Sequence, residues 1–249
     1  MAHSSKETLT IAWCDNGLTD GKFTEGLVYT ILQAPSRGMM VNNAMRVQGN
    51  QIGRQRQNLF DKWADDVKTD WLLWVDSDIV LTIDVLKKLW DTADKVARPV
   101  VCGIYFISKE SEQSVMMPMP AIFLENGNEH QIQYVHPLPD NQIIQVDNAG
   151  LGLTLMHKSC VPKLREVSPD YSLFAEKEAL GDKFISEDIV FFRNMKKAGI
   201  PVHANTGARV KHMKRFALDE SYYKLYWSFA QLDAQRRAEE MNRESTEKQ

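Results

Sequence analysis

The sequence has few cysteines and no long apolar run, and both absences narrow the range of functions. Cys14, Cys102 and Cys160 lie far apart and form no CxxC pair, so we expect reduced thiols rather than disulfides or a cysteine zinc site. No stretch approaches the roughly 18 apolar residues of a membrane span. Residues 1–9 lack the apolar core of a signal peptide. We therefore expect a cytoplasmic protein without a membrane span.

An excess of one charge is also missing. The sequence has 30 Lys and Arg against 33 Asp and Glu, a formal net charge of −3, which gives no reason to expect general nucleic-acid binding. The 249 residues, 43% of them hydrophobic and 25% charged, have the composition of an ordinary globular protein. That length suits one large α/β domain or two small ones, and no internal repeat is visible.

Strands and helices alternate in the first half of the sequence. Apolar runs at 8–13, 71–75 and 100–106 are typical of strands, and 71–75 (WLLWV) is apolar throughout, as in a strand covered on both faces. Between them we predict helices at 23–33, 51–67 and 83–96 and a weaker strand at 38–42. Strand–helix–strand units in series predict a parallel sheet with right-handed crossovers.

Shorter strands follow in the second half, where we expect antiparallel pairing. AIFLEN, QIQYVH and QIIQVD are separated by Asn, Gly and Pro turns, and LGLTLMHK is a further strand. The Met- and Pro-rich stretch 111–120 is predicted to be a loop. One helix is expected at 159–167, and a second in ISEDIVFFRNMKKAG, capped by Ser186 and stopped by Gly199.

The C-terminal end of the sequence predicts one more helix, which begins near Asp219. Its apolar residues would share one face, which makes the helix a candidate surface for homo-oligomer formation; they are Tyr222, Leu225, Tyr226, Phe229 and Leu232. We thus predict one α/β domain over 1–218, with a mostly parallel, Rossmann-like sheet and antiparallel additions in its second half. Residues 219–249 would form the C-terminal helix and a polar tail.

The strongest functional signal is TDWLLWVDSDIVLT, in which a buried strand ends at two carboxylates, Asp76 and Asp78. Ligands bind at the carboxyl edge of open α/β sheets. Two neighbouring acids at such an edge repel each other unless a cation joins them. Mg²⁺ and Mn²⁺ suit one or two carboxylates together with phosphate oxygens. The alternative is an ordinary solvated strand end or a helix cap.

DSDIVLT also matches the nucleophile loop of haloacid-dehalogenase-like phosphohydrolases, with Gly181-Asp182 or Glu187-Asp188 as the later acidic motif. The context favours this function less. The later acids should follow a buried strand, whereas the apolar residues IVFF come after Glu187-Asp188 and read as a helix. About 70 residues with their own βα unit also precede Asp76. The phosphohydrolase stays as the alternative function.

Four segments together resemble the glycosyltransferases of the GT-A fold, above all their small phage and bacterial members. They are TIAWCDNG, IGRQRQNLFDKW, WLLWVDSDI with its DxD motif, and the pair ISEDIVFFRNMKKAG and ARVKHMK. The segment VDNAGLGLTLMHKSCVPKL is also similar to the family. The resemblance implies a metal-dependent glycosyltransferase that moves a sugar from a nucleotide-sugar donor, a UDP-sugar in many members, to an acceptor hydroxyl.

The family assigns roles to particular residues of this sequence. The resemblance implies Asp76, Asp78 and His212 as ligands of Mn²⁺ or Mg²⁺. The donor nucleotide and its diphosphate would be bound by a larger set of residues: Cys14, Asp15, Arg54, Arg56, Asp76, Ser77 and Lys214. Asp188, with Glu187 second, is the candidate general base, and helix capping is the simpler role for both. Gly150 and Gly152 would leave room for a sugar or form strand bulges.

The acceptor stays open among a protein, a glycan and a modified nucleic acid. The sugar, the nucleotide and the stereochemical outcome are open as well. A nucleotidyltransferase would need a Gly-rich loop after the first strand, and CDNGLTDGK is a poor match. A non-catalytic module that binds a nucleotide or a carbohydrate is a third class of function.

Overall fold

The computed structural model describes residues 7–110, 116–125, 132–170, 172–175, 177–178, 184–216 and 218–246. Two compact units make up the chain. The first consists of Met1–Ile107 and Met119–Met213, and the second of Ser108–Pro118 and Lys214–Gln249. The predicted phosphohydrolase acid Asp182 lies outside the described residues.

Seven strands form the central sheet of the first unit, in the order β10-β15-β5-β12-β3-β1-β2. Their bounds are β1 Thr8–Asp15, β2 Met40–Gln48, β3 Trp71–Val75, β5 Val100–Ile104, β10 Ile143–Gln145, β12 Leu153–His157 and β15 Val202–Arg209. β1 pairs in parallel with β2 and β3, as does β15 with β5. Only β12 and β10 run in the opposite direction. The predicted fold class, a mostly parallel α/β sheet with antiparallel additions from the second half, is confirmed.

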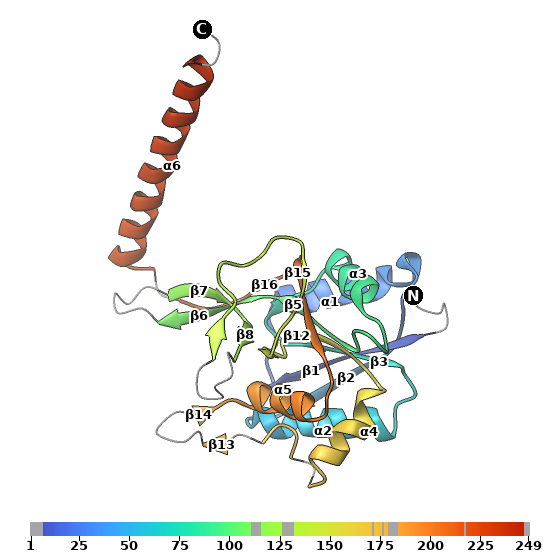
Figure 1. Cartoon of the computed structure of the whole chain (residues 1–249). Helices are drawn as coiled ribbons and strands as arrows, with labels where there is room; N and C mark the ends of the chain where they lie inside the picture. Colours follow the sequence, from blue (N-terminus) through green and yellow to red (C-terminus); the bar gives the residue numbers. More distant parts are fainter. Residues whose placement is uncertain are drawn as a thin grey trace. The chain divides into compact units, whose positions relative to one another are not determined.

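Helices cover both faces of this sheet (Figure 1). Their bounds are α1 Gly21–Gln33, α2 Ile52–Asp65, α3 Ile83–Thr92, α4 Cys160–Val167 and α5 Glu187–Lys197, with a short 3-10 turn at Pro35–Arg37. Phe23 of α1 and Leu89 of α3 belong to one apolar cluster. Phe60, Leu164 and Phe191 of α2, α4 and α5 belong to the other, on the opposite face. β3 contributes to both clusters, which explains its uninterrupted apolar run.

The chain also forms several smaller sheets. β8 (Ile122–Leu124) pairs with β9 (Gln133–Tyr134) and β11 (Asn148–Ala149), which gives the predicted antiparallel additions. The remaining pairs are β4 Ile79–Val80 with β16 Lys211–His212, β6 Phe106–Glu110 with β7 Met116–Pro120, and β13 Lys177–Glu178 with β14 Phe184–Ile185.

Three sequence predictions need correction. The stretch 111–120 is not a loop throughout, because Met116–Pro120 pairs as β7; residues 111–115 lie outside the described part. α3 ends at Thr92 rather than near 96, since the Asp94 carboxylate accepts the N–H groups of Val96 and Ala97 and closes a turn there. The weak strand predicted at 38–42 extends to Gln48 as β2.

The start of α5 also differs from the prediction. Ser186 is the N-cap residue and has the extended backbone of that position, but its hydroxyl makes no capping bond. It donates instead to the carboxylate of Asp188, which also accepts the Ile189 N–H. Acids at this positive helix end and Lys196 near the negative end follow the expected charge pattern. Gly199, with φ of 64°, follows the end of the helix as expected.

The second unit contains α6 (Glu220–Thr246), which begins close to the predicted residue 219. Asp219 caps it by accepting the Ser221 N–H at 2.9 Å. Tyr226 and Phe229 are exposed on this helix, and its role in oligomer formation stays a prediction, as does the domain division at 218. In the described part of the chain, no helix combines the length and the apolar character needed to cross a membrane.

Candidate active site

Asp78 and His212 lie side by side although 134 residues separate them in the sequence. The chain leaves β3, turns through the acidic pair and enters β4, which pairs antiparallel with β16 so that His212 is opposite Ile79. The Met213 N–H donates to the Asp78 carbonyl at 2.8 Å and extends this pairing. As a result, His212 Nε2 is 3.1 Å from Asp78 Oδ2. Strand pairing thus brings two of the three predicted metal ligands together.

The hydrogen bonds of His212 determine which ring nitrogen faces Asp78. Nδ1 lies 2.8 Å from the carbonyl oxygen of Phe106. A carbonyl can only accept, so Nδ1 carries the proton, and Nε2 of the neutral imidazole presents a lone pair toward the Asp78 carboxylate. These two atoms attract each other only if a proton or a cation lies between them. A histidine nitrogen and a carboxylate oxygen at this separation fit a divalent cation that takes its other ligands from phosphate and water.

Asp76, the third predicted metal ligand, is held by Arg56 instead. Arg56 Nη2 donates to Asp76 Oδ1 at 3.0 Å, and the Asp76 N–H donates to the Gly152 carbonyl at 3.1 Å. Among the described residues, no group of three or more His, Cys, Asp and Glu side chains is arranged to hold a metal ion. Asp78 and His212 are close enough to share a cation, and metal binding by Asp76, Asp78 and His212 stays a prediction.

Arg56 is a buried counter-ion for carboxylates from two elements. Its Nη1 lies 2.9 Å from Glu187 Oε1 at the start of α5, and its side chain is only 6% exposed. Burial by itself lowers the pKa of this guanidinium, but Asp76, Glu187 and Asp188 outweigh burial and raise it. Burial also raises the pKa of the Glu187 carboxyl despite the nearby Arg56. The predicted contact of Arg56 with a diphosphate stays a prediction.

Asp188 is more exposed than Glu187 and makes no ion pair with Arg56 in the described structure. Its carboxylate accepts from Ser186 and from the Ile189 N–H, at the positive end of α5. Glu187 and Asp188 therefore lie at the start of a helix, as the sequence predicts. The later acids of a phosphohydrolase should instead follow a buried strand, so this local structure favours that function less.

The end of β1 places Asp15 beside Arg46 of β2. Arg46 donates to both carboxylate oxygens of Asp15, at 2.5 and 2.7 Å, and the Gly17 N–H donates to Oδ1 at 2.7 Å. The bond from Arg46 lowers the pKa of Asp15. Burial raises the pKa of the Cys14 thiol to about 12, so it stays neutral. Nucleotide binding by Cys14 and Asp15 stays a prediction, and Arg46 is a further charged neighbour of Asp15.

Sequence analysis did not identify Arg46 or Tyr105. Arg46 lies within β2, and Tyr105 directly follows the buried strand β5. The only sequence signal for Tyr105 was its place at the end of an apolar run, next to Phe106. Gly150 and Gly152 do not leave empty space for a sugar, because Tyr105 fills it: a Cβ on Gly150 would lie 1.8 Å from Tyr105 Oη.

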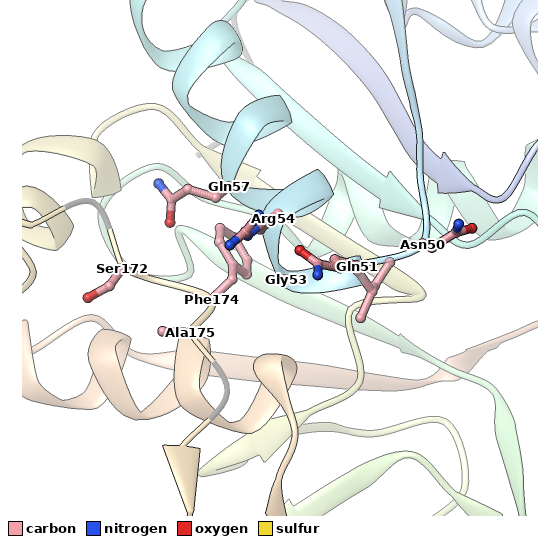
Figure 2. A pocket seen from close by; sticks show the side chains of 9 residues that line it. Asn50, Gln51, Gly53, Arg54, Gln57, Ser172, Phe174 and Ala175 are labelled. Atoms are coloured by element: carbon pink, nitrogen blue, oxygen red, sulfur yellow. The ribbon is translucent and has the colours of Figure 1, made fainter.

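A cavity of about 520 Å³ opens at the start of α2. Figure 2 shows Gln51, directly before this helix, and Arg54 and Gln57 within it, opposite the segment 172–175. Its lining is rich in amide and hydroxyl groups and also includes Asn50, Ile52, Gly53, Ser172, Phe174 and Ala175. At Gly53 an added Cβ would lie 3.5 Å from Glu187 Cβ, so this wall of the cavity adjoins the start of α5. Arg54 therefore offers its cationic side chain to a cavity next to the candidate base.

Two predicted nucleotide ligands remain. The Ser77 carbonyl accepts the Asp20 N–H at 3.0 Å, which ties the acidic turn to the start of α1. Lys214 belongs to the second unit, and its contact with a nucleotide stays a prediction.

The similar solved structures all have low sequence identity to this chain. A197 from STIV has a TM-score of 0.52 at 15% identity, over 84% of this chain and 86% of that one. GalNAc-T7, crystallised with UDP, GalNAc and Mn²⁺, has 0.45 at 8%, over 84% and 44%. A glycosyltransferase involved in the glycosylation of the major capsid of PBCV-1 has 0.41 at 13%, over 82% and 82%. No family model and no curated protein matches the sequence. The likeness to the STIV protein concerns the fold alone.

Proposed function

We propose that this protein is a glycosyltransferase that transfers a sugar from a nucleotide-sugar donor, a UDP-sugar in our hypothesis, to an acceptor hydroxyl. One observation carries the proposal: Asp78 Oδ2 and His212 Nε2 lie 3.1 Å apart at the carboxyl edge of a mostly parallel sheet. Ligands of α/β proteins bind at that edge. The imidazole nitrogen and the carboxylate oxygen are suitable ligands for Mn²⁺ or Mg²⁺, because the Nδ1 proton is directed toward the Phe106 carbonyl and away from Asp78.

Asp78 and His212 would bind the cation, and Arg54 would attract the anionic donor. When bound, the cation would supply Lewis-acid stabilisation of the diphosphate that leaves as the bond to the anomeric carbon breaks. Arg56 would hold Asp76 and Glu187 in place while the sugar passes through an oxocarbenium-like transition state.

The acceptor hydroxyl would lose its proton to a carboxylate at the start of α5. Asp188 is the better candidate, because it is less buried than Glu187 and is not held by Arg56. The oxygen of the deprotonated acceptor would then form the new bond to the anomeric carbon. If the sugar instead keeps its configuration, this base is not required.

Incubation with a panel of nucleotide sugars and Mn²⁺ tests the proposal when both nucleoside diphosphate and free phosphate are assayed. Slow donor hydrolysis should release nucleoside diphosphate without any acceptor. Release of phosphate from small phosphoesters would identify the phosphohydrolase instead. Binding of a nucleotide sugar without either product would identify a non-catalytic binding module.

A further inference from the structure

Tyr105 packs directly against the imidazole of His212. The two ring centroids are 5.2 Å apart and the ring planes stand at 89°, an edge-to-face contact. Aromatic rings prefer this arrangement, because it places the positive edge of one ring against the negative face of the other. Tyr105 is itself only 5% exposed, so the surrounding core holds its ring in place. A fixed ring at this position restricts the tilt of the imidazole.

The hydroxyl of Tyr105 contacts Gly152, whose carbonyl binds the backbone of Asp76. The Gly152 N–H donates to Tyr105 Oη at 3.3 Å, and the Gly152 carbonyl accepts the Asp76 N–H at 3.1 Å. Glycine is required for this approach, since a Cβ on Gly152 would lie 2.9 Å from Tyr105 Cζ and 2.7 Å from Asp76 Oδ2. One side chain thus links His212 to the segment beside the acidic turn.

Two polar contacts also restrain the imidazole: Nδ1 lies 2.8 Å from the Phe106 carbonyl oxygen, and Nε2 lies 3.1 Å from Asp78 Oδ2. Both contacts act at ring nitrogens, and a ring held there can still tilt about the line that joins the two nitrogens. Groups behind a metal-binding histidine orient it, and their loss commonly costs 10- to 100-fold in metal affinity.

We propose that Tyr105 is a positioning residue for the metal site: its ring holds His212 with Nε2 toward Asp78, and its hydroxyl anchors Gly152 beside Asp76. Tyr105 touches neither the cation nor the substrate, and it acts through His212 and Gly152. This role rests on the proposed function, because it presupposes that Asp78 and His212 bind a divalent cation.

Calorimetric titration of the full chain with Mn²⁺ alone tests this role. Tyr105→Met keeps most of the buried volume and removes the ring, and it should raise the Kd for Mn²⁺ about 10- to 100-fold. Tyr105→Phe retains the ring and should keep the Kd within a few-fold of the wild type. Phe23→Met is the matched control, since it removes another buried ring of the same apolar cluster, on α1. It should lower Tm without changing the Kd.

An unchanged Kd in Tyr105→Met, with a Tm that falls as in Phe23→Met, would reduce Tyr105 to a packing residue and overturn the inference. If Tyr105→Met does not fold, Tyr105→Leu takes its place with the same expected result. A wild-type protein that does not bind Mn²⁺ would overturn the metal site itself, and with it the proposed function. The two failures are therefore distinguishable in one set of titrations.

Discussion

Arg56 and Glu187 form an ion pair in which Nη1 lies 2.9 Å from Oε1, while the same guanidinium binds Asp76 at 3.0 Å. One buried cation thus joins the acidic turn after β3 to the start of α5. Asp76 and Glu187 have separate predicted roles, Asp76 in metal binding and Glu187 in catalysis. The pairing makes the charges of Asp76 and Glu187 interdependent, because without Arg56 the two carboxylates would lie near each other with no cation between them.

Replacing Arg56 should be strongly destabilising. Arg56→Gln leaves Asp76 and Glu187 without their shared counter-ion, and the loss of one partner of a buried ion pair costs about 3–5 kcal/mol. The double variant Arg56→Gln, Glu187→Gln should recover part of this loss, since it removes one of the two stranded charges. Urea unfolding gives both values. Arg37→Gln, which breaks an exposed pair with Asp84, should cost about 0–1 kcal/mol. Equal losses of unfolding free energy in Arg56→Gln and Arg37→Gln would contradict a buried network of Arg56, Asp76 and Glu187.

Glu187 should give the stability a distinct pH dependence. Burial raises its pKa above the ordinary value of 4.5, so the folded protein holds this proton more tightly than the unfolded chain. The contribution to stability is therefore full below pH 4.5 and is lost as the pH rises through the folded-state pKa. In Glu187→Gln this contribution should disappear. Unfolding free energies of both proteins, measured from acidic to neutral pH, should differ in slope above 4.5; parallel curves would refute the raised pKa.

His212→Ala should weaken metal activation. Removing a metal ligand should raise the Mn²⁺ concentration for half-maximal activity by about tenfold or more, at least as much as the loss of a supporting group behind a ligand. The measurement is a Mn²⁺ titration of donor hydrolysis. His203→Ala, on β15, is the control and should leave the titration unchanged. An unchanged titration in His212→Ala would remove His212 from the metal site.

Asp188→Asn separates catalysis from helix capping. Asparagine accepts hydrogen bonds from Ser186 and Ile189 nearly as well as aspartate, so Tm should change little. Loss of a general base should slow transfer about 10²–10⁴-fold, and donor affinity should stay the same. Retention of transfer within a few-fold of the wild type would assign Asp188 to capping and direct attention to Glu187 or to a reaction without a protein base.

The strand β3 and the acids that follow it were the most predictable part of the protein. β3 is apolar over its whole length because both sheet faces are covered, and the acids that follow it mark the carboxyl edge. β15 was missed entirely, although it lies inside the sheet. Its buried positions include Ala204, Thr206 and Ala208, small or polar residues that form no apolar run. Whether such a segment forms a strand depends more on its pairing with neighbouring strands than on its own composition.

The ion pairs of the site could not be predicted from the sequence. Arg56 shows helical spacing with its neighbours, which predicts a helix and gives no information on which side chain meets it. Its partners lie 20 and 131 positions further along the chain, at Asp76 and Glu187. The same limit applies to Arg46 and Asp15, which meet only because β2 pairs beside β1.

The most direct measurement is calorimetric binding of a nucleoside diphosphate, with UDP as the probe, in Mn²⁺ and in EDTA. Wild type should bind in Mn²⁺ and lose binding in EDTA, because the diphosphate is bound through the cation. Asp78→Asn should lose the Mn²⁺-dependent binding while its circular dichroism stays the same, and Asp233→Asn, an exposed acid on α6, should bind like wild type. Equal UDP binding in Mn²⁺ and EDTA, or undiminished binding by Asp78→Asn, would contradict a metal-dependent donor site at Asp78 and His212.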